Sequence, residues 1–204
     1  MGFKYKNVLV TGGTGFLGKN LVPVLQDMGA DAAERLFNLK EYDLIIHAAV
    51  YQGAGDFTVK YPADQFFKNN LIHTNTLECW KRHQPNAKLI GIGSSCSYPA
   101  QKRELIFIED QISGLLGACD YNGDILNIGS GIGTKISTLA EVVKKLSGFK
   151  GEIYYNRDRF VGIRSKVLNT KKAKDLFGWP DNYEMHTLEE GIKKTIEWYK
   201  EYKQ

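Results

Sequence analysis

Three glycines follow an apolar segment near the start of the chain, at a spacing suited to binding phosphate groups. Residues 7–18 are Asn-Val-Leu-Val-Thr-Gly-Gly-Thr-Gly-Phe-Leu-Gly, a predicted strand that leads into a helical pattern. Gly12 would permit a tight turn, Gly15 would let the backbone approach a pyrophosphate, and Gly18 would let the helix pack closely on the strand. The amides of a helix that begins near Phe16 would bind the phosphates. The segment predicts a dinucleotide-binding turn, although a purely structural turn could use the same residues.

The elements that must position this turn alternate along the chain as strands and helices. We expect strands at 8–11, 42–47, 88–93, 106–108, 125–128 and 152–155, and helices at 19–28, 66–83, 111–118, 137–147, 170–177 and 188–202, with Ser137 or Thr138 and then Thr170 as helix caps. The continuous apolar run at 42–47 is typical of a parallel strand covered on both faces. The sequence therefore predicts an α/β fold with a doubly wound, Rossmann-like parallel sheet.

The composition narrows the class of protein. The net charge of +4, from 27 basic and 23 acidic residues, is too small to indicate nucleic-acid binding. Cys79, Cys96 and Cys119 have neither metal-site nor disulfide spacing, which favours a reducing compartment and predicts no metal site. The sequence starts without a signal-peptide pattern, and no apolar run is long enough to cross a bilayer. We therefore expect a cytoplasmic protein without a nucleic-acid or membrane partner.

The glycine turn resembles a known family pattern. Residues 11–18 match Thr-Gly-x-x-Gly-Phe-x-Gly, the pattern of the extended short-chain dehydrogenase/reductase family of NAD-dependent epimerases and dehydratases, at every position. Residues 45–49, Ile-Ile-His-Ala-Ala, resemble the family's strand-end His-x-Ala-Ala motif, although a buried strand end would look the same. Residues 69–76 resemble the next helix, in which an asparagine helps to hold the central strands. The resemblance implies NADP or NAD as cofactor, contacted by Gly12, Thr14, Gly15, Phe16, Leu17, Gly18, His47, Ala48 and Ala49.

A second segment resembles one branch of this family. Residues 93–99, Gly-Ser-Ser-Cys-Ser-Tyr-Pro, look like the Gly-Ser-Ser-Cys-x-Tyr-Pro segment of the GDP-L-fucose synthases. The resemblance implies that Ser94 hydrogen-bonds the reacting sugar oxygen and that Cys96 transfers protons beside the ketone. A thiol suits this task when its surroundings bring its pKa toward the working pH. The alternative is that Cys96 is a small buried hydrophobe at a strand end.

The C-terminal half continues the resemblance. Matching segments lie at 103–110, 126–131, 162–169 and 174–179. The resemblance implies that Arg103 and Arg164 contact the diphosphate of a nucleotide sugar, since a guanidinium presents paired donors to phosphate oxygens. Arg159 competes with Arg164 for this role. The implied partner is a nucleotide-diphosphate sugar, GDP-linked by the likeness to the fucose synthases, and the resemblance is compatible with a homodimer.

One family motif has no convincing counterpart. The family carries a catalytic Tyr-x-x-x-Lys on a helix well downstream of the serine, so that the tyrosine can exchange a proton with the substrate oxygen. Tyr98 and Lys102 fit the string, but Tyr98 lies four residues after Ser94 and precedes Pro99. We do not expect this pair to be catalytic. The catalytic helix and much of the substrate domain are expected to be missing between Pro99 and Arg103.

A second gap is expected near Asp31. The distance from Gly18 to Leu44 leaves room for one helix but not for a second strand. In this fold that strand ends in the residue that recognises the ribose, about 20 residues beyond the glycines. Asp31 follows the first helix too early for that role, so the choice between NAD and NADP stays open, with NADP mildly favoured by the likeness to the fucose synthases.

These observations predict the organisation and function of the chain. Residues 1–100 would form a dinucleotide-binding Rossmann-like region, and residues 101–204 its remainder with a reduced C-terminal sugar-nucleotide-binding portion. The implied activity is that of an NAD(P)-dependent epimerase/reductase acting on a GDP-4-keto-6-deoxy sugar. The alternatives are an internally deleted, non-catalytic nucleotide-binding relative, and a nucleotide-sugar 4-epimerase or dehydratase, which usually carries Thr or Ser in place of Cys96.

Overall fold

The computed structural model describes residues 3–34, 37–53, 57–94, 104–123, 125–155 and 167–202. The chain divides into two compact units, Met1–Gly93 and Ser94–Gln204. We describe each unit by itself.

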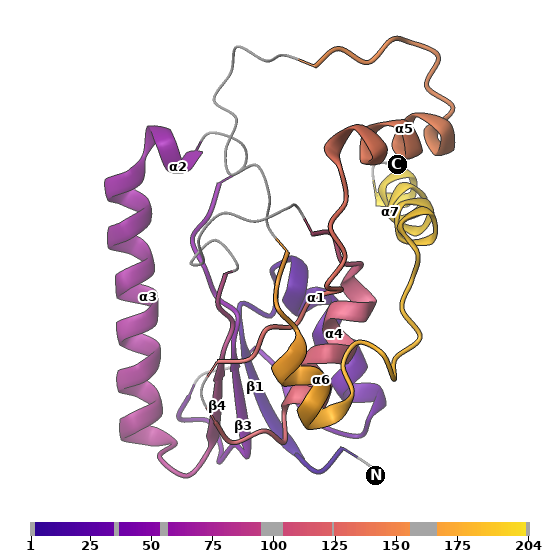
Figure 1. Ribbon diagram of the computed structural model, residues 1–204. Helices are drawn as coiled ribbons and strands as arrows, with labels where there is room; N and C mark the ends of the chain where they lie inside the picture. The colour runs from indigo at the N-terminus through magenta and orange to yellow at the C-terminus, as the bar shows by residue number, and fades with distance from the viewer. Residues whose placement is uncertain are drawn as a thin grey trace. The chain divides into compact units, whose positions relative to one another are not determined.

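The N-terminal unit is built on a parallel sheet (Figure 1). Its strands, in the spatial order β2-β1-β3-β4, are β1 (Asn7–Thr11), β2 (Asp31–Ala33), β3 (Leu44–His47) and β4 (Lys88–Gly91). Thr11 is in register with His47, and His47 with Gly91, so that three strands end at the same edge of the sheet. This arrangement confirms the predicted α/β fold with a Rossmann-like parallel sheet.

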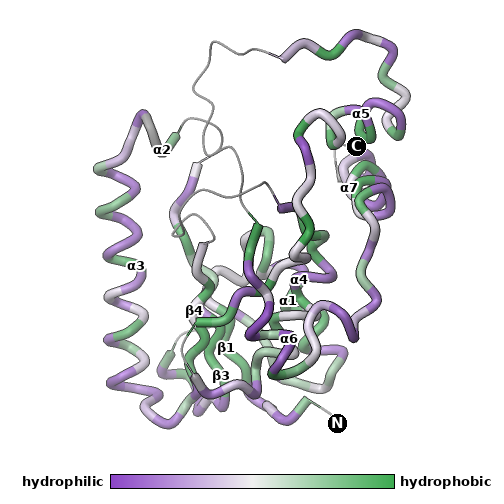
Figure 2. The backbone as a smooth tube through the Cα atoms, viewed as in Figure 1, coloured by the Kyte–Doolittle hydropathy of each residue, from purple (hydrophilic) through white to green (hydrophobic). Residues whose placement is uncertain are grey.

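Apolar strand residues form the core of this unit, and Figure 2 shows the hydrophobic character of β1 and β3. Leu9, Tyr42, Ile45 and Ala87 form a buried cluster, against which Phe37, Trp80 and Leu89 pack. The helices of the unit are α1 (Phe16–Asp27), α2 (Phe57–Lys60) and α3 (Pro62–His83). α1 buries Leu21 and Leu25, which have no exposed surface.

The expectation that a second strand is missing near Asp31 was wrong. Gly29 adopts a left-handed conformation with φ 85°, and the Ala30 amide donates to the Leu25 carbonyl. The chain therefore reverses within a few residues of the end of α1. It enters β2 at Asp31, which pairs with Asn7 of β1.

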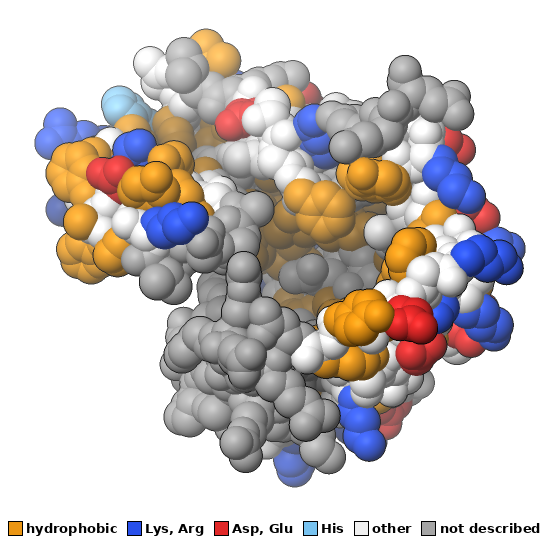
Figure 3. Space-filling view, turned by 90° about the horizontal axis from the view of Figure 1, so that it is seen from above, with side chains coloured by type: hydrophobic (Ala, Val, Ile, Leu, Met, Phe, Trp, Pro, Cys, Tyr) orange, Lys and Arg blue, Asp and Glu red, His pale blue; other side chains and the backbone are white. Residues whose placement is uncertain are grey.

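The helix α3 leaves much of its apolar surface uncovered. Phe66, Phe67, Leu71 and Leu77 are all exposed, and Thr76 is the buried residue of this helix. On the left of Figure 3, exposed apolar side chains of the N-terminal unit are visible beside charged ones. The sequence predicted the helix but not which of its faces would be covered.

The C-terminal unit is helical in its described part. Its helices are α4 (Ile108–Ala118), α5 (Ile136–Ser147), α6 (Lys171–Phe177) and α7 (Leu188–Tyr202). Residues 125–128 and 152–155 are irregular, and 106–108 lead into α4, so the three strands expected there are not formed. α5 begins one residue before Ser137, with Lys135 at its N-cap, and Thr170 occupies the N-cap of α6 without a side-chain hydrogen bond.

Trp179 is the centre of packing between α4 and the segment after α6. Its side chain is fully buried, and its Nε1–H donates to the Gly129 carbonyl over 2.7 Å. A Cβ at Gly114 of α4 would lie 2.4 Å from the Ile128 side chain and 3.0 Å from Trp179. This helix therefore needs glycine where the indole packs against it.

Replacing this indole tests its role. We expect Trp179→Phe to lower the free energy of unfolding by about 1 to 3 kcal/mol, because it leaves a buried carbonyl without its donor. Trp198→Phe is the matched control, because the Trp198 side chain is 49% exposed. Chemical denaturation followed by circular dichroism measures both. Equal losses in the two variants would contradict the role given to Trp179.

Candidate functional site

Gly12 and Gly18 make the turn between β1 and α1 possible. Gly12 has a positive φ of 76°, and a Cβ on it would lie 2.8 Å from both N and Cα of Ala49. A Cβ on Gly18 would lie 2.3 Å from the Gly12 carbonyl oxygen. Two backbone segments therefore lie against each other at positions where any side chain would separate them.

Gly15 plays a different part, because a side chain on it would meet a single backbone atom of the turn. It is the N-cap of α1, and its amide donates to the Gly12 carbonyl over 2.9 Å. A Cβ on it would meet only that oxygen, at 3.2 Å. Thr14, Gly15 and Phe16 are exposed, and the first turn of α1 holds no acidic residue. The start of α1 therefore presents exposed residues and a partial positive charge to an anion.

Glu34 faces the same turn from the end of β2. Its carboxylate accepts the amides of Gly12 over 3.3 Å and Thr14 over 3.2 Å. This residue was missed because the sequence analysis expected no strand before it. Its position 16 residues after Gly18 was the available signal. Asp31, at the start of β2, instead forms an ion pair with Lys40.

The strand-end residues His47, Ala48 and Ala49 lie beside the glycine turn. The Ala48 amide donates to the Thr11 carbonyl over 3.1 Å, and the Ala49 amide lies 3.4 Å from Thr11 Oγ1. His47 is buried, and its Nδ1 lies 2.6 Å from the same hydroxyl. Burial, and secondarily the nearby His73, lower the pKa of His47 below 6.5. The ring is therefore neutral at pH 7.

The loop after β3 is fixed to α3 by an asparagine. Asn69 accepts the Tyr51 amide over 2.7 Å and donates to the Tyr51 carbonyl over 2.9 Å. Through these two hydrogen bonds the Asn69 side chain pairs with the backbone of Tyr51, as the backbone of a neighbouring strand would. This role is structural, as the sequence analysis expected for an asparagine of this helix.

The remaining predicted site residues are not joined to the glycine turn by the structure. Ser94 is exposed shortly after β4. The other candidates lie outside the described residues, namely Cys96, Tyr98, Lys102, Arg103, Arg159 and Arg164.

In the C-terminal unit, Glu104 binds two segments that are distant in sequence. One carboxylate oxygen accepts the Gly131 amide over 2.9 Å and the Ser130 hydroxyl over 3.3 Å. The other accepts the Leu168 amide over 2.6 Å. In the sequence Glu104 directly follows Arg103, and Leu168 comes four residues after Arg164.

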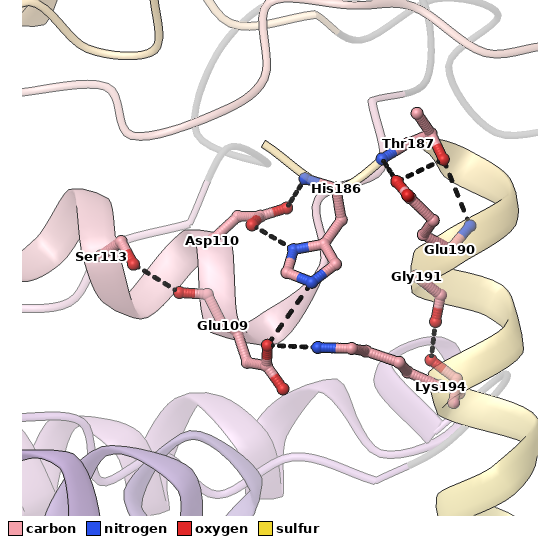
Figure 4. A network of polar contacts seen from close by, with 9 residues as sticks. Glu109, Asp110, Ser113, His186, Thr187, Glu190, Gly191 and Lys194 are labelled. Atoms are coloured by element: carbon pink, nitrogen blue, oxygen red, sulfur yellow. Dashed lines mark hydrogen bonds and ion pairs between the residues drawn. The ribbon is translucent and has the colours of Figure 1, made fainter. Parts of the chain in front are cut away.

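A second polar cluster joins the start of α4 to the start of α7 (Figure 4). The buried Asp110 carboxylate accepts the His186 amide over 3.2 Å and lies 2.7 Å from His186 Nδ1. Lys194 donates to Glu109 over 2.7 Å, and Glu109 lies 3.5 Å from His186 Nε2. Asp110 and His186 line a cavity of about 270 Å³ whose other walls are mostly apolar. The cluster fixes α7 to α4.

Two further features concern metals and membranes. In the part of the chain that the structure describes, no group of three or more His, Cys, Asp or Glu residues could hold a metal ion. None of the described helices has the length and hydropathy needed to cross a bilayer.

The chain resembles nucleotide-sugar enzymes in sequence. A model of the NAD dependent epimerase/dehydratase family matches residues 28–112. A putative UDP-glucose 4-epimerase of Methanocaldococcus jannaschii is 33% identical over 100 residues, 49% of this chain and 32% of that protein. A putative GDP-L-fucose synthase of Arabidopsis thaliana is 33% identical over 101 residues, 48% of this chain and 30% of that protein. The chain thus spans about a third of the length of these curated relatives.

Solved structures share the fold. The Bordetella bronchiseptica enzyme WbmF in complex with NADH superposes with a TM-score of 0.75 at 19% identity, over 98% of this chain and 93% of that one. The GDP-mannoheptose C4 reductase MlghC of Campylobacter jejuni, with NADP bound, gives a TM-score of 0.78 at 17% identity, over 96% of this chain and 98% of that one. With its parallel sheet and its glycine turn, the chain resembles members of the NAD dependent epimerase/dehydratase family, whose model matches it over residues 28–112.

Proposed function

We propose that this chain binds a nicotinamide dinucleotide at the turn between β1 and α1. The observation that carries the proposal is the geometry of this turn, in which Gly12 and Gly18 close the backbone while Gly15 leaves the start of α1 open. An incoming pyrophosphate would meet helix amides and no acidic side chain of that helix. The NADH and NADP complexes of the structural neighbours support this assignment.

We further propose that NAD is preferred over NADP. A carboxylate at the end of the second strand hydrogen-bonds the ribose 2′-hydroxyl of NAD, and its charge disfavours a 2′-phosphate. Glu34 directly follows β2 and faces the glycine turn, which supports this contact. This preference is opposite to the one suggested by the likeness to the fucose synthases.

We propose a nucleotide-diphosphate sugar, GDP-linked, as the substrate class. The support is the segment at 93–99 and the relatives named GDP-L-fucose synthase. Ser94 would hydrogen-bond the sugar oxygen, Cys96 would move a proton beside the ketone, and Arg103 and Arg164 would bind the diphosphate. A bound nicotinamide would accept or supply the hydride. In this scheme the contact of Glu104 with the Leu168 amide links the residue after Arg103 to a segment that follows Arg164.

A second candidate function is nucleotide binding without efficient catalysis. It is favoured by the short connection between Pro99 and Arg103, which leaves no room for the family's catalytic helix. Ketone reduction leaves charge on the substrate oxygen, which the family's tyrosine normally protonates. Here the available string is the doubtful pair Tyr98 and Lys102.

Gly15→Val tests the cofactor site. The valine would occupy the approach to the start of α1 while meeting one backbone oxygen of the turn, so we expect a folded variant whose NADH affinity falls about tenfold or more. Fluorescence titration measures the affinity, and circular dichroism verifies the fold. Gly29→Asn is the control at the other end of α1, since asparagine tolerates the left-handed conformation found there. Unchanged affinity in Gly15→Val would refute the assignment.

Glu34→Gln tests the preference between the cofactors. We expect wild-type protein to bind NADH more tightly than NADPH, and the variant to shift the ratio of the two dissociation constants about tenfold toward NADPH, because the repelling charge is removed. The amide retains an oxygen that can accept the Gly12 amide, which limits structural effects. A wild-type preference for NADPH would show that Glu34 does not select the cofactor.

Turnover distinguishes the two candidate functions. Using protein whose intact mass equals the 23.0 kDa of this sequence, we expect NADPH or NADH oxidation with a GDP-4-keto-6-deoxy sugar at least about a hundredfold below an ordinary rate of about 10 per second. Tyr98→Phe is the companion variant. Ordinary turnover that disappears in Tyr98→Phe would show that Tyr98 and Lys102 form a working catalytic pair.

A further inference from the structure

A chain of three side chains runs from the glycine turn to the surface of α3. His47 Nδ1 lies 2.6 Å from Thr11 Oγ1, and His47 Nε2 lies 2.7 Å from His73 Nδ1. The two rings meet edge-on, with centroids 5.0 Å apart and an interplanar angle of 89°. His47 is buried whereas His73 is exposed, so the chain connects a buried strand end to solvent.

The donors and acceptors of these three side chains favour one direction of hydrogen bonding. The Ala49 amide can only donate, so Thr11 Oγ1, 3.4 Å away, accepts from it. Among the described residues, the other hydrogen-bonding partner of this hydroxyl is His47 Nδ1. If the hydroxyl donates to Nδ1, its hydrogen has an acceptor among the described residues, whereas a donating Nδ1–H would leave it without one there. We take the first arrangement, in which the neutral His47 ring is protonated on Nε2. That N–H donates to His73 Nδ1, and His73 carries its own proton on Nε2.

We propose that His73 is a positioning residue for the dinucleotide site, acting through His47 and Thr11 to hold the Ala49 backbone against Gly12. The inference rests on the proposed cofactor site. Its geometric basis is the 2.8 Å that would separate a Cβ on Gly12 from the Ala49 nitrogen, which leaves the turn no room to adjust if Ala49 shifts. His73 has no contact with the glycine turn of its own among the described residues, and its effect passes along the hydrogen bonds.

The arrangement requires a neutral His47 ring, because Nδ1 accepts a hydrogen bond while Nε2 donates one. Burial lowers the pKa of His47, and among the described titratable groups the nearby His73 lowers it secondarily. Glu34 contacts the turn at the Gly12 and Thr14 amides, and Gly91 of the neighbouring β4 carries no charge.

The pH dependence of folding follows with a definite sign. The lowered pKa means that the unfolded His47 ring takes its proton at a higher pH than the folded ring. This contribution to stability is therefore complete above pH 6.5 and is lost as the pH falls from 6.5 toward the folded value. Cofactor affinity should weaken over the same range.

Three variants test the proposal. His73→Leu removes the acceptor, His73→Asn restores an acceptor near the position of Nδ1, and His83→Leu changes another exposed histidine of α3. At pH 8 we expect His73→Leu to weaken NADH binding roughly fivefold to tenfold, and the other two variants to stay within about twofold of wild type. Equal weakening in His73→Leu and His73→Asn, or none in His73→Leu, would overturn the inference.

Nuclear magnetic resonance gives a readout that needs no cofactor. Long-range ¹H–¹⁵N spectra of the histidine rings at pH 8 should show His47 protonated on Nε2. Exchange of the Ala49 amide hydrogen should be faster in His73→Leu than in wild type or His83→Leu. A His47 ring protonated on Nδ1, or unchanged Ala49 exchange, would also overturn the inference. If wild type binds no dinucleotide, the proposed function fails, and these two measurements still decide whether His73 holds Ala49 in place.

Discussion

The contact between the backbones of Gly12 and Ala49 constrains the N-terminal unit more than any other feature of its candidate site. Glycine is required at position 12 for two reasons: its φ is 76°, and a Cβ on it would lie 2.8 Å from Ala49. The contact brings the ends of β1 and β3 together and determines where α1 starts. This contact sets the positions of Glu34, His47 and Gly15 relative to one another. The chemistry of the site therefore depends on the missing side chain of Gly12.

The C-terminal unit is organised by buried or half-buried carboxylates and an indole, without a sheet in its described part. Glu104 binds backbone amides of two segments, and Asp110 binds His186 at the start of α7. Trp179 supplies the apolar counterpart through its contact with Gly114. Such charge-assisted contacts with backbone amides are geometrically specific. They can hold irregular segments in place where no strand ladder does so.

Features encoded by local sequence patterns were predicted, whereas features that depend on contacts between distant residues were missed. The glycine turn and the apolar run at 42–47 are local patterns, and the structure contains the turn and β3 there. β2 was missed because its three residues have a weak pattern of their own and form a strand by pairing with β1. Residues 125–128 have the composition of a strand but form no strand pairing in the described structure. The partners Asp110 and His186 lie 76 residues apart, and no local pattern indicates such contacts.

The distribution of tryptophans gives the two units separate optical signatures. Trp80 packs against the core of the N-terminal unit and donates its indole N–H to the Ala87 carbonyl over 2.8 Å. Trp179 is enclosed in the C-terminal unit, where its neighbours include Tyr183, with ring centroids 4.8 Å apart. Each unit therefore contains an intrinsic fluorophore whose emission responds to the loss of its own packing. Single-tryptophan versions of the protein could report whether the two halves of the chain melt as one cooperative body or in sequence.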